Sequence, residues 1–204
     1  MSPKQRSSYH HGSLREELMT ACLALIEAEG IGAVSLRRVA REAGVSPGAP
    51  YHHFTDRSQL LGALSIRGFE QLVERMRAAE AGAQTPQREL GALLEAYVRF
   101  AREQSAYFRL MFRPELTGPD KHPDVRAAGD AAFAVLVESV ARYQADGSID
   151  TDPGTLATML WSLAHGLASL WLDGPLQDKS AKLGVDPERL AEQVVRAMEQ
   201  LLSN

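Results

Sequence analysis

Residues 35–54 read SLRRVAREAGVSPGAPYHHF, and this stretch decides the fold of the first part of the chain. Ser35 is a good N-cap for a short helix, which we expect over residues 36–43. Gly44 closes this helix, because glycine adopts left-handed backbone geometry at little cost. A second short helix is expected over residues 46–54, where a serine cap is followed by a proline at the first helical position. Two short helices around a glycine turn predict a helix-turn-helix, with a plain antiparallel helix pair as the alternative.

Basic side chains at two helix starts favour a helix-turn-helix that binds DNA. Arg37 and Arg38 lie in the first turn of a helix, where the helix dipole disfavours a cation by about 0.3–1 kcal/mol. Their position is explained if an anion such as a backbone phosphate docks there. Arg57 stands in the same way at the start of the next helix, and residues 51–53 add a polar, aromatic surface. We therefore predict double-stranded DNA as a partner.

The rest of the chain has the pattern of an all-α protein. Apolar residues recur at helical spacing almost everywhere, and no alternating strand pattern of useful length appears. We predict about nine helices, arranged as an N-terminal helix-turn-helix three-helix bundle (residues 1–55) and a larger helical C-terminal domain (residues 56–204). Beyond the two short helices, helices are expected at residues 13–29, 56–79, 90–101, 125–143, 153–172 and 187–201.

The composition is that of a soluble globular protein. Of the 204 residues, 45% are hydrophobic and 24% are charged, which argues against wholesale disorder. No apolar run reaches the roughly 18 residues needed to cross a bilayer, and residues 1–12 are polar, unlike a secretory signal. The single cysteine, Cys22, lies on an apolar helix stripe and suits a buried structural thiol in a reducing compartment. We predict a cytoplasmic protein without a membrane partner.

The charge distribution is compatible with DNA contact through the first domain alone. The net charge of −4 has the wrong sign for a phosphate binder. Residues 1–60, however, carry seven Lys or Arg and six Asp or Glu, whereas the remaining residues carry fifteen and twenty. Four of the six histidines also fall in this first part, as two adjacent pairs. Because adjacent helical side chains diverge, neither pair makes a good metal site, and we predict no metal and no cofactor.

The stretch 35–54 resembles the signature of the TetR family of bacterial repressors over its whole length. The preceding residues 9–15, YHHGSLR, are similar to the opening of one subgroup, and the close match covers roughly residues 9–64. The resemblance implies that the helix at residues 46–54 lies against the DNA groove. Together with the arginines at the helix starts and the serine cap, the predicted DNA-binding residues are Arg37, Arg38, Ser46, Gly48, Ala49, Tyr51, His52, His53 and Arg57.

These predicted contacts differ in kind. The resemblance implies phosphate contacts from Tyr51, His53 and Arg57, and base-edge or phosphate contacts from Gly48, Ala49 and His52. One departure from the family pattern affects the second group, because Pro50 stands where the family usually has leucine. Proline removes the amide that would bond back to Ser46, so we expect the helix to start as a tighter turn.

The second domain contains a motif that resembles the Trp-His-Gly element of a TetR C-terminal subgroup, at residues 161–167 (WSLAHGL). The family implies a small-molecule pocket in this domain, whose ligand is often apolar or aromatic. Aromatic residues supply apolar walls of the kind such pockets have, although they equally suit an ordinary core, and His165 equally suits a hydrogen-bonded core histidine. The predicted ligand-binding residues are Tyr97, Phe100, Phe108, Met111, Phe112, Trp161, Ser162 and His165.

The last two predicted helices favour a homodimer. Residues 156–172 are too apolar for one exposed side, and residues 190–202 carry an apolar stripe of their own. Two such helices from each of two subunits form a four-helix interface, which matches the homodimer that the family resemblance implies. A two-fold dimer predicts a roughly palindromic operator.

Three classes of function are open to such a chain. The predicted function is a DNA-binding transcriptional regulator, most simply a repressor that a small molecule releases from its operator. One alternative is an all-α small-molecule sensor that acts through protein partners and has no use for Arg37, Arg38 and Tyr51. A hydrolase built on Ser162 and His165 is disfavoured, because the chain has no Gly-x-Ser-x-Gly motif, and we predict no enzymatic activity.

Overall fold

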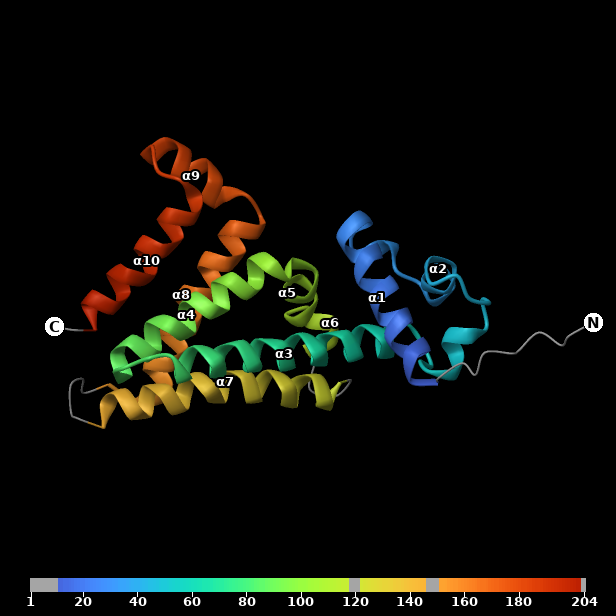
Figure 1. The fold of residues 1–204 in the computed structure, drawn as a ribbon, viewed down its shortest axis with the longest axis horizontal. Helices are drawn as coiled ribbons and strands as arrows, with labels where there is room; N and C mark the ends of the chain where they lie inside the picture. Colours follow the sequence, from blue (N-terminus) through green and yellow to red (C-terminus); the bar gives the residue numbers. More distant parts are fainter. Residues whose placement is uncertain (1–10, 118–121, 146–150, 203–204) are drawn as a thin grey trace, which may run out of the picture. The chain divides into compact units, whose positions relative to one another are not determined.

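The computed structural model describes residues 11–117, 122–145 and 151–202. Within these ranges all the regular secondary structure is helical (Figure 1). The prediction of an all-α fold is confirmed, with ten α-helices and two short 3-10 helices in the described residues rather than about nine helices. The helices are α1 (His11–Glu29), η1 (Ile31–Ala33), α2 (Leu36–Glu42), η2 (Ala49–His52), α3 (Arg57–Ala81), α4 (Pro86–Glu103), α5 (Ser105–Met111), α6 (Pro114–Thr117), α7 (Pro123–Gln144), α8 (Pro153–Leu172), α9 (Pro175–Leu183) and α10 (Pro187–Leu201).

The chain divides into two compact units, residues 1–64 and residues 65–204, so that the division falls inside α3. The first residues of α3 belong to the smaller unit because Leu60, Leu61 and Leu64 are buried with its other core residues. The division lies later in the chain than the predicted boundary between residues 55 and 56.

The smaller unit is built around α1, which packs against η1 and α2. Its core consists of fully or almost fully buried apolar side chains from α1, α2, the start of α3 and the loops between them, and Pro50 of η2 is also buried. Phe54 anchors the segment after η2 in this core, and the Arg15 guanidinium lies 5.4 Å from the centre of its ring. The main core residues are Leu18, Cys22, Leu25, Ile26, Val34, Leu36, Val39, Phe54, Leu60 and Leu64.

Local signals in the sequence set the limits of α2 and the start of α3. The Ser35 hydroxyl accepts a hydrogen bond from the Arg38 amide at 3.2 Å, as an N-cap does. Gly44 has a φ of 68°, a backbone conformation that strains other residues, and this turn ends α2 at Glu42, one residue before the predicted end. The Asp56 carboxylate accepts from the Gln59 amide at 2.9 Å and so caps α3. In contrast, α1 starts at His11, before the predicted cap at Ser13.

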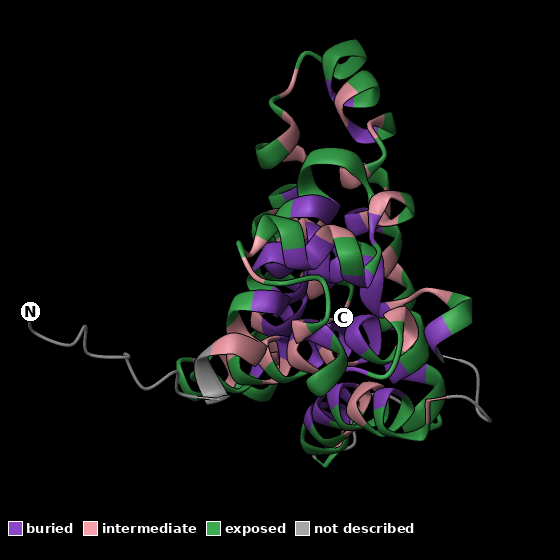
Figure 2. Cartoon of the chain, turned by 90° about the vertical axis from the view of Figure 1, so that its right-hand side faces the viewer, coloured by how far each residue is buried: buried purple, intermediate pink, exposed green. Residues whose placement is uncertain are grey.

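The larger unit has α4 at its centre, in contact with α7, α8 and α10 (Figure 1). Helix α7 also packs against α8, and α9 joins α8 to α10 and contacts both. Buried residues gather on the helix faces that point toward one another (Figure 2). Helices α8 and α10 both begin with an aspartate cap and a proline: Asp152 accepts from the Thr155 amide at 2.8 Å, and Asp186 accepts from the Glu188 amide at 2.9 Å.

Helix α8 has an unusual composition for a helix that is partly exposed. Among the described helices, it is the one whose length and composition would allow it to cross a membrane. The core helix of a soluble protein can have the same length and composition. One face of α8 lies in the core of the larger unit through Leu160, Ala164 and Leu167. Its other face exposes Met159 and Leu170, which are 61% and 46% accessible.

Candidate DNA-binding surface and ligand cavity

The second helix of the predicted helix-turn-helix is shorter and tighter than the sequence prediction of residues 46–54. The structure has only the 3-10 helix η2 there. Its hydrogen bonds run between residues three apart: the Ala49 amide donates to the Ser46 carbonyl at 3.0 Å, and the Tyr51 amide donates to the Gly48 carbonyl at 3.2 Å. Pro50 has no amide with which to form the α-helical bond to Ser46, and its ring is buried. The expected tighter start therefore extends through the whole helix.

Most residues predicted to bind DNA lie on the accessible surface of the smaller unit. Arg37, Ser46, Gly48 and His52 are exposed, and the Tyr51 side chain is 54% accessible. The remaining predicted residues, Arg38, Ala49, His53 and Arg57, are half-buried.

Two of the predicted phosphate ligands have partners inside the chain. The Arg38 guanidinium forms an ion pair with Glu29, the last residue of α1. The Arg57 guanidinium donates to the carbonyl of Val34 at 3.0 Å and to that of Ile31 at 2.7 Å, which joins the start of α3 to the segment between α1 and α2. These contacts explain why a cation is tolerated at each helix start without a bound anion. Arg37 is exposed, so a docked phosphate still explains why this cation lies at the start of a helix.

The thiol of Cys22 is buried in the core of the smaller unit. Burial raises the pKa of Cys22 to about 12, against the opposing effect of the Arg57 charge. The thiol is therefore protonated and unreactive at neutral pH. Over residues 11–117, 122–145 and 151–202, no three His, Cys, Asp or Glu side chains come together as a metal site requires, and His10 of the first histidine pair lies outside these ranges.

The larger unit contains a cavity of about 470 Å³, within the size range of small-molecule sites. It lies between four helices, α3, α4, α7 and α8, with Phe112 after α5 as a further wall residue. Apolar and aromatic side chains form most of the wall. The lining residues are Phe69, Leu72, Met76, Leu93, Leu94, Tyr97, Phe112, Val125, Arg126, Gly129, Asp130, Ala132, Phe133, Leu136, Thr158, Trp161 and Ala164.

Three of the eight predicted ligand-binding residues, Tyr97, Phe112 and Trp161, line this cavity. The structure places the other five, Phe100, Phe108, Met111, Ser162 and His165, outside the lining.

These five residues have other surroundings. Phe100 is fully buried, with the Arg75 guanidinium 5.5 Å from its ring centre, and Met111 is fully buried beside Gly68. Phe108 packs at 5.3 Å from the ring of His165, between ring centres. Ser162 is exposed and donates to the Thr158 carbonyl at 2.7 Å, so it forms no nucleophile–base pair with His165.

A chain of hydrogen bonds joins two wall residues to His165. The Trp161 indole N–H donates to the Tyr97 hydroxyl oxygen at 3.3 Å, and that oxygen lies 2.9 Å from His165 Nδ1. Burial raises the pKa of Tyr97 and lowers the pKa of His165, so both groups are neutral near pH 7. The arrangement that satisfies all three groups has the Tyr97 hydroxyl donating to Nδ1, which places the imidazole proton on Nε2.

A charged pair lies in the otherwise apolar lining. Arg126 and Asp130 occupy successive turns of α7, with Nε and Oδ2 3.7 Å apart. Their side chains are 60% and 74% accessible, which places the pair where the cavity opens to solvent. Gly129 lies between them in the sequence, and a Cβ atom there would stand 3.3 Å from the Phe69 ring. The opening thus combines two charges with a helix position that carries no side chain.

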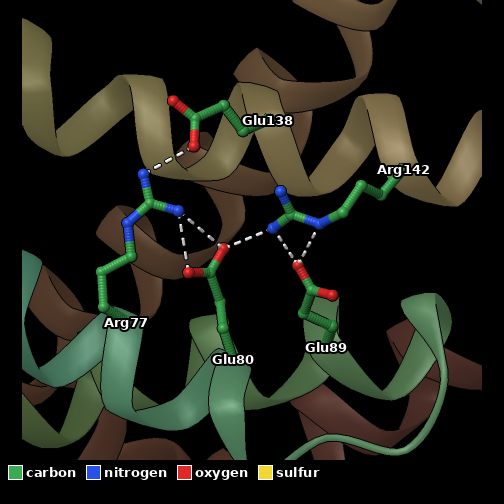
Figure 3. Close-up of polar contacts among 5 residues, drawn as sticks. All are labelled: Arg77, Glu80, Glu89, Glu138 and Arg142. Atoms are coloured by element: carbon green, nitrogen blue, oxygen red, sulfur yellow. Dashed lines mark hydrogen bonds and ion pairs between the residues drawn. The ribbon is translucent and has the colours of Figure 1, made fainter.

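Five charged residues form a continuous network among three of the four cavity helices (Figure 3). Arg77 of α3 binds Glu80 at 2.9 Å and Glu138 of α7 at 2.5 Å, and Arg142 of α7 binds Glu80 at 2.5 Å and Glu89 of α4 at 3.0 Å through Nε. Burial raises the pKa of Glu89, but the hydrogen bonds and charge of Arg142 outweigh this effect, so the net pKa is lowered. The network therefore holds the end of α3 against α4 and α7.

Sequence reasoning missed the cavity residues of α3 and α7. Their apolar character is visible in the sequence, but Phe69, Leu72 and Phe133 have the same spacing as ordinary core residues. The one available signal was Gly129 inside the helix predicted at residues 125–143, since glycine in a helix interior is unfavourable and needs a reason.

Comparisons with known proteins agree with this arrangement of helices. Residues 18–64 match the profile described as "Bacterial regulatory proteins, tetR family", and residues 90–198 match "Tetracyclin repressor-like, C-terminal domain". The transcriptional activator FasR of Mycolicibacterium smegmatis is 26% identical, over 83% of this chain and 78% of its own.

Solved structures show the same fold over almost the whole chain. A protein with unknown function from Rhodococcus sp. RHA1 is 34% identical, with a TM-score of 0.81 and 97% of each chain covered. FadR from Bacillus subtilis, solved in complex with stearoyl-CoA, is 15% identical, with a TM-score of 0.72 over 89% of this chain and 95% of its own. With a profile matched over more than half of its length, this chain belongs to the TetR family of bacterial transcriptional regulators.

Proposed function

We propose that the protein is a homodimeric repressor that leaves a palindromic operator when a small molecule enters the cavity of the larger unit. The observation that carries the proposal is that one chain combines the family's DNA-binding segment with a cavity of about 470 Å³. Helix α3 begins directly after the DNA-binding segment, and further along it contributes Phe69, Leu72 and Met76 to the cavity wall. A ligand that favours one position of α3 would change operator affinity through this shared helix.

The exposed residues of α2, of η2 and of the turn between them are the proposed DNA contacts. Arg37 and the edge formed by Ser46, Gly48, Tyr51 and His52 are accessible, so they can reach a duplex without unfolding any part of the unit. Arg38 and Arg57 support this surface from behind through their bonds to Glu29 and to the η1 segment. We assign them a positioning role as well as the phosphate contact that the family resemblance implies. Ala49 and His53 complete the proposed surface.

The proposed dimer interface is the exposed face of α8, extended by α10. Met159 and Leu170 lie eleven residues apart, three helical turns, and so share one face of α8. Leu201 at the end of α10 is 76% accessible. Burying such side chains against a second copy would remove apolar surface from water.

The DNA part of the proposal is tested by fluorescence anisotropy on duplexes from the region upstream of the protein's own gene, over a series of salt concentrations. Binding is expected to weaken steeply as salt rises, because phosphate contacts release counterions. Arg37→Ala should weaken binding and lower the salt slope by about one unit, whereas Arg99→Ala on the exposed side of α4 should not. No binding to any fragment at low salt would refute the proposal and favour the sensor that acts through protein partners.

A ligand panel added to the preformed complex tests the regulatory part. Release of the duplex identifies a repressor that responds by dissociating. Tighter binding on addition of ligand would refute release and would match an activator or a repressor that needs its ligand. Given the family, no enzymatic activity is expected from Ser162 and His165, and Ser162→Ala should leave both DNA binding and ligand release unchanged.

A further inference from the structure

The cavity wall offers no free neutral hydrogen-bond donor to a ligand. Three lining residues have neutral donor groups, and each is already hydrogen-bonded within the protein: Trp161 to Tyr97, Tyr97 to His165, and the Thr158 hydroxyl to the Gly154 carbonyl at 2.7 Å. A ligand group that needs a hydrogen-bond donor would, deep in the cavity, either lack one or break one of these bonds. The inner part of the site therefore selects an apolar body.

The opening has a different chemistry, because Arg126 and Asp130 line it. Their ion pair is exposed and has an N···O distance of 3.7 Å, so its two partners are easily exchanged for others. Of the two charges, Arg126 is the better placed to hold a ligand. It lies at the fourth position of α7, where the helix dipole favours an anion, and its guanidinium can bind a carboxylate through two parallel hydrogen bonds.

Gly129 lets an aromatic ring approach α7 closely beside this charge. It lies one turn after Val125 in the interior of a 22-residue helix, and the Phe69 ring occupies the space that a side chain there would take. An alanine Cβ would already stand in close contact with that ring. The aromatic wall formed by Phe69, Phe133 and Trp161 thus belongs to the same cavity as Arg126, so an elongated ligand with its head at Arg126 would place its body against these rings.

We propose that the ligand class is an anionic amphiphile, with a single carboxylate at Arg126 and an unbranched or aromatic apolar body in the cavity. This inference rests on the proposed function, because it names the kind of effector that the same cavity accepts. A cationic amphiphile, held by Asp130 and by aromatic ring faces, is the competing ligand class.

The test compares three amphiphiles with the same chain and different heads, each below its micelle concentration: dodecanoate, dodecanol and dodecyltrimethylammonium. Binding to the full chain is measured by calorimetry. The Trp171→Phe variant leaves Trp161, in the cavity wall, as the reporter of ligand position, because Trp171 lies outside the lining against Arg102. Dodecanoate is expected to bind at least about tenfold more tightly than the other two and to change Trp161 fluorescence.

Charge variants separate head recognition from general electrostatics. Arg126→Gln should remove the preference for dodecanoate, and Asp130→Asn should strengthen dodecanoate binding by removing the competing carboxylate. Arg109→Gln is the matched control, because Arg109 is 54% accessible, lies 3.4 Å from Asp173 and is outside the cavity lining. It should change none of the three affinities. Thermal unfolding of each variant shows that the fold is retained.

The outcomes distinguish this inference from the proposed function, because duplex anisotropy is followed in the same samples. Tighter binding of the ammonium compound, equal binding of all three heads, or no binding at all overturns the anionic class. If the ammonium compound or the alcohol releases the duplex, the regulator is intact and only the ligand class is wrong. If dodecanoate binds with the expected preference and the duplex stays bound, the ligand class stands and regulation by this cavity is refuted.

Discussion

At the residue scale, the wall of the cavity depends on one hydroxyl group. The Tyr97 hydroxyl receives the Trp161 N–H and contacts His165 Nδ1, so a single oxygen satisfies polar groups on two turns of α8. Tyr97 also packs edge-to-face on Phe108, with ring centres 5.7 Å apart. Because Tyr97 is buried and His165 is partly buried, losing the oxygen leaves two hydrogen-bonding groups without this partner.

Tyr97→Phe keeps the ring and removes this hydroxyl. We expect a loss of about 1–3 kcal/mol in the free energy of unfolding, since the Trp161 N–H and His165 Nδ1 lose their partner. Urea unfolding monitored by circular dichroism gives the value. The control is Tyr51→Phe, where the side chain is 54% accessible and a change within about 0.5 kcal/mol is expected. Equal effects of the two substitutions would contradict the role of the Tyr97 hydroxyl.

His165 gives the protein a stability that depends on pH. Burial lowers the pKa of His165 below its ordinary value of 6.5, so the unfolded chain binds a proton at a higher pH than the folded chain does. The free energy of unfolding is therefore fully maintained above pH 6.5 and falls as the pH drops from there toward the lowered pKa. Urea unfolding at successive pH values should show this decrease, and His165→Gln should abolish it. A decrease of the same size in the variant would assign the effect to another group.

At the scale of elements, helices were predictable where their signals are local. Ser35, Gly44, Asp152 and Asp186 act on backbone groups within four residues, so the limits they set are visible in the sequence. The structure of η2 differed from the predicted helix over residues 46–54, because the missing amide of Pro50 affects the whole of so short a helix.

Helix α9 was missed for a different reason. Its sequence PLQDKSAKL has few apolar residues, and it is fixed by contacts with α8 and α10 that lie outside the segment itself. Cavity walls are non-local in the same way: Phe69 and Gly129 are sixty residues apart, and only packing of α3 beside α7 makes them neighbours. The family resemblance therefore predicted the presence of a pocket, whereas aromatic content predicted only part of its lining.

The charged network on α3, α4 and α7 should contribute measurably to stability. Arg142→Ala removes the partner that Glu80 and Glu89 share. Because these side chains are only 11% and 14% accessible, water cannot fully replace it. We expect a loss of about 1–3 kcal/mol, since hydrogen bonds to covered charged groups are costly to break. The control is Arg126→Ala on the same helix, whose exposed pair is worth well under 1 kcal/mol. Chemical unfolding without ligand compares them, and a loss below 0.5 kcal/mol in Arg142→Ala would contradict the prediction.

At the scale of the whole molecule, the accessible apolar face of α8 predicts self-association. Replacing both Met159 and Leu170 by glutamate places two charges on the proposed interface, and like charges from two subunits repel there. We expect the mass measured by light scattering after size exclusion to fall from that of a dimer to that of a monomer. Operator affinity should fall with it, because each monomer then reaches one half-site.

The control for the dimer prediction is Leu183→Glu on α9. Leu183 is 65% accessible but does not belong to the proposed face, so this variant should stay dimeric and keep its operator affinity. A monomeric wild type, or a dimer that survives the double substitution, would place the interface elsewhere.

The buried thiol makes it possible to measure how often the DNA-binding unit opens. Cys22 is the single cysteine of the sequence and is completely inaccessible, so an alkylating reagent can modify it only when α1 separates from its neighbours. The labelling rate at a fixed high pH thus counts opening events, as amide exchange does for backbone groups. A bound operator duplex should slow the labelling in proportion to its affinity. An effector that releases the duplex should restore the original rate.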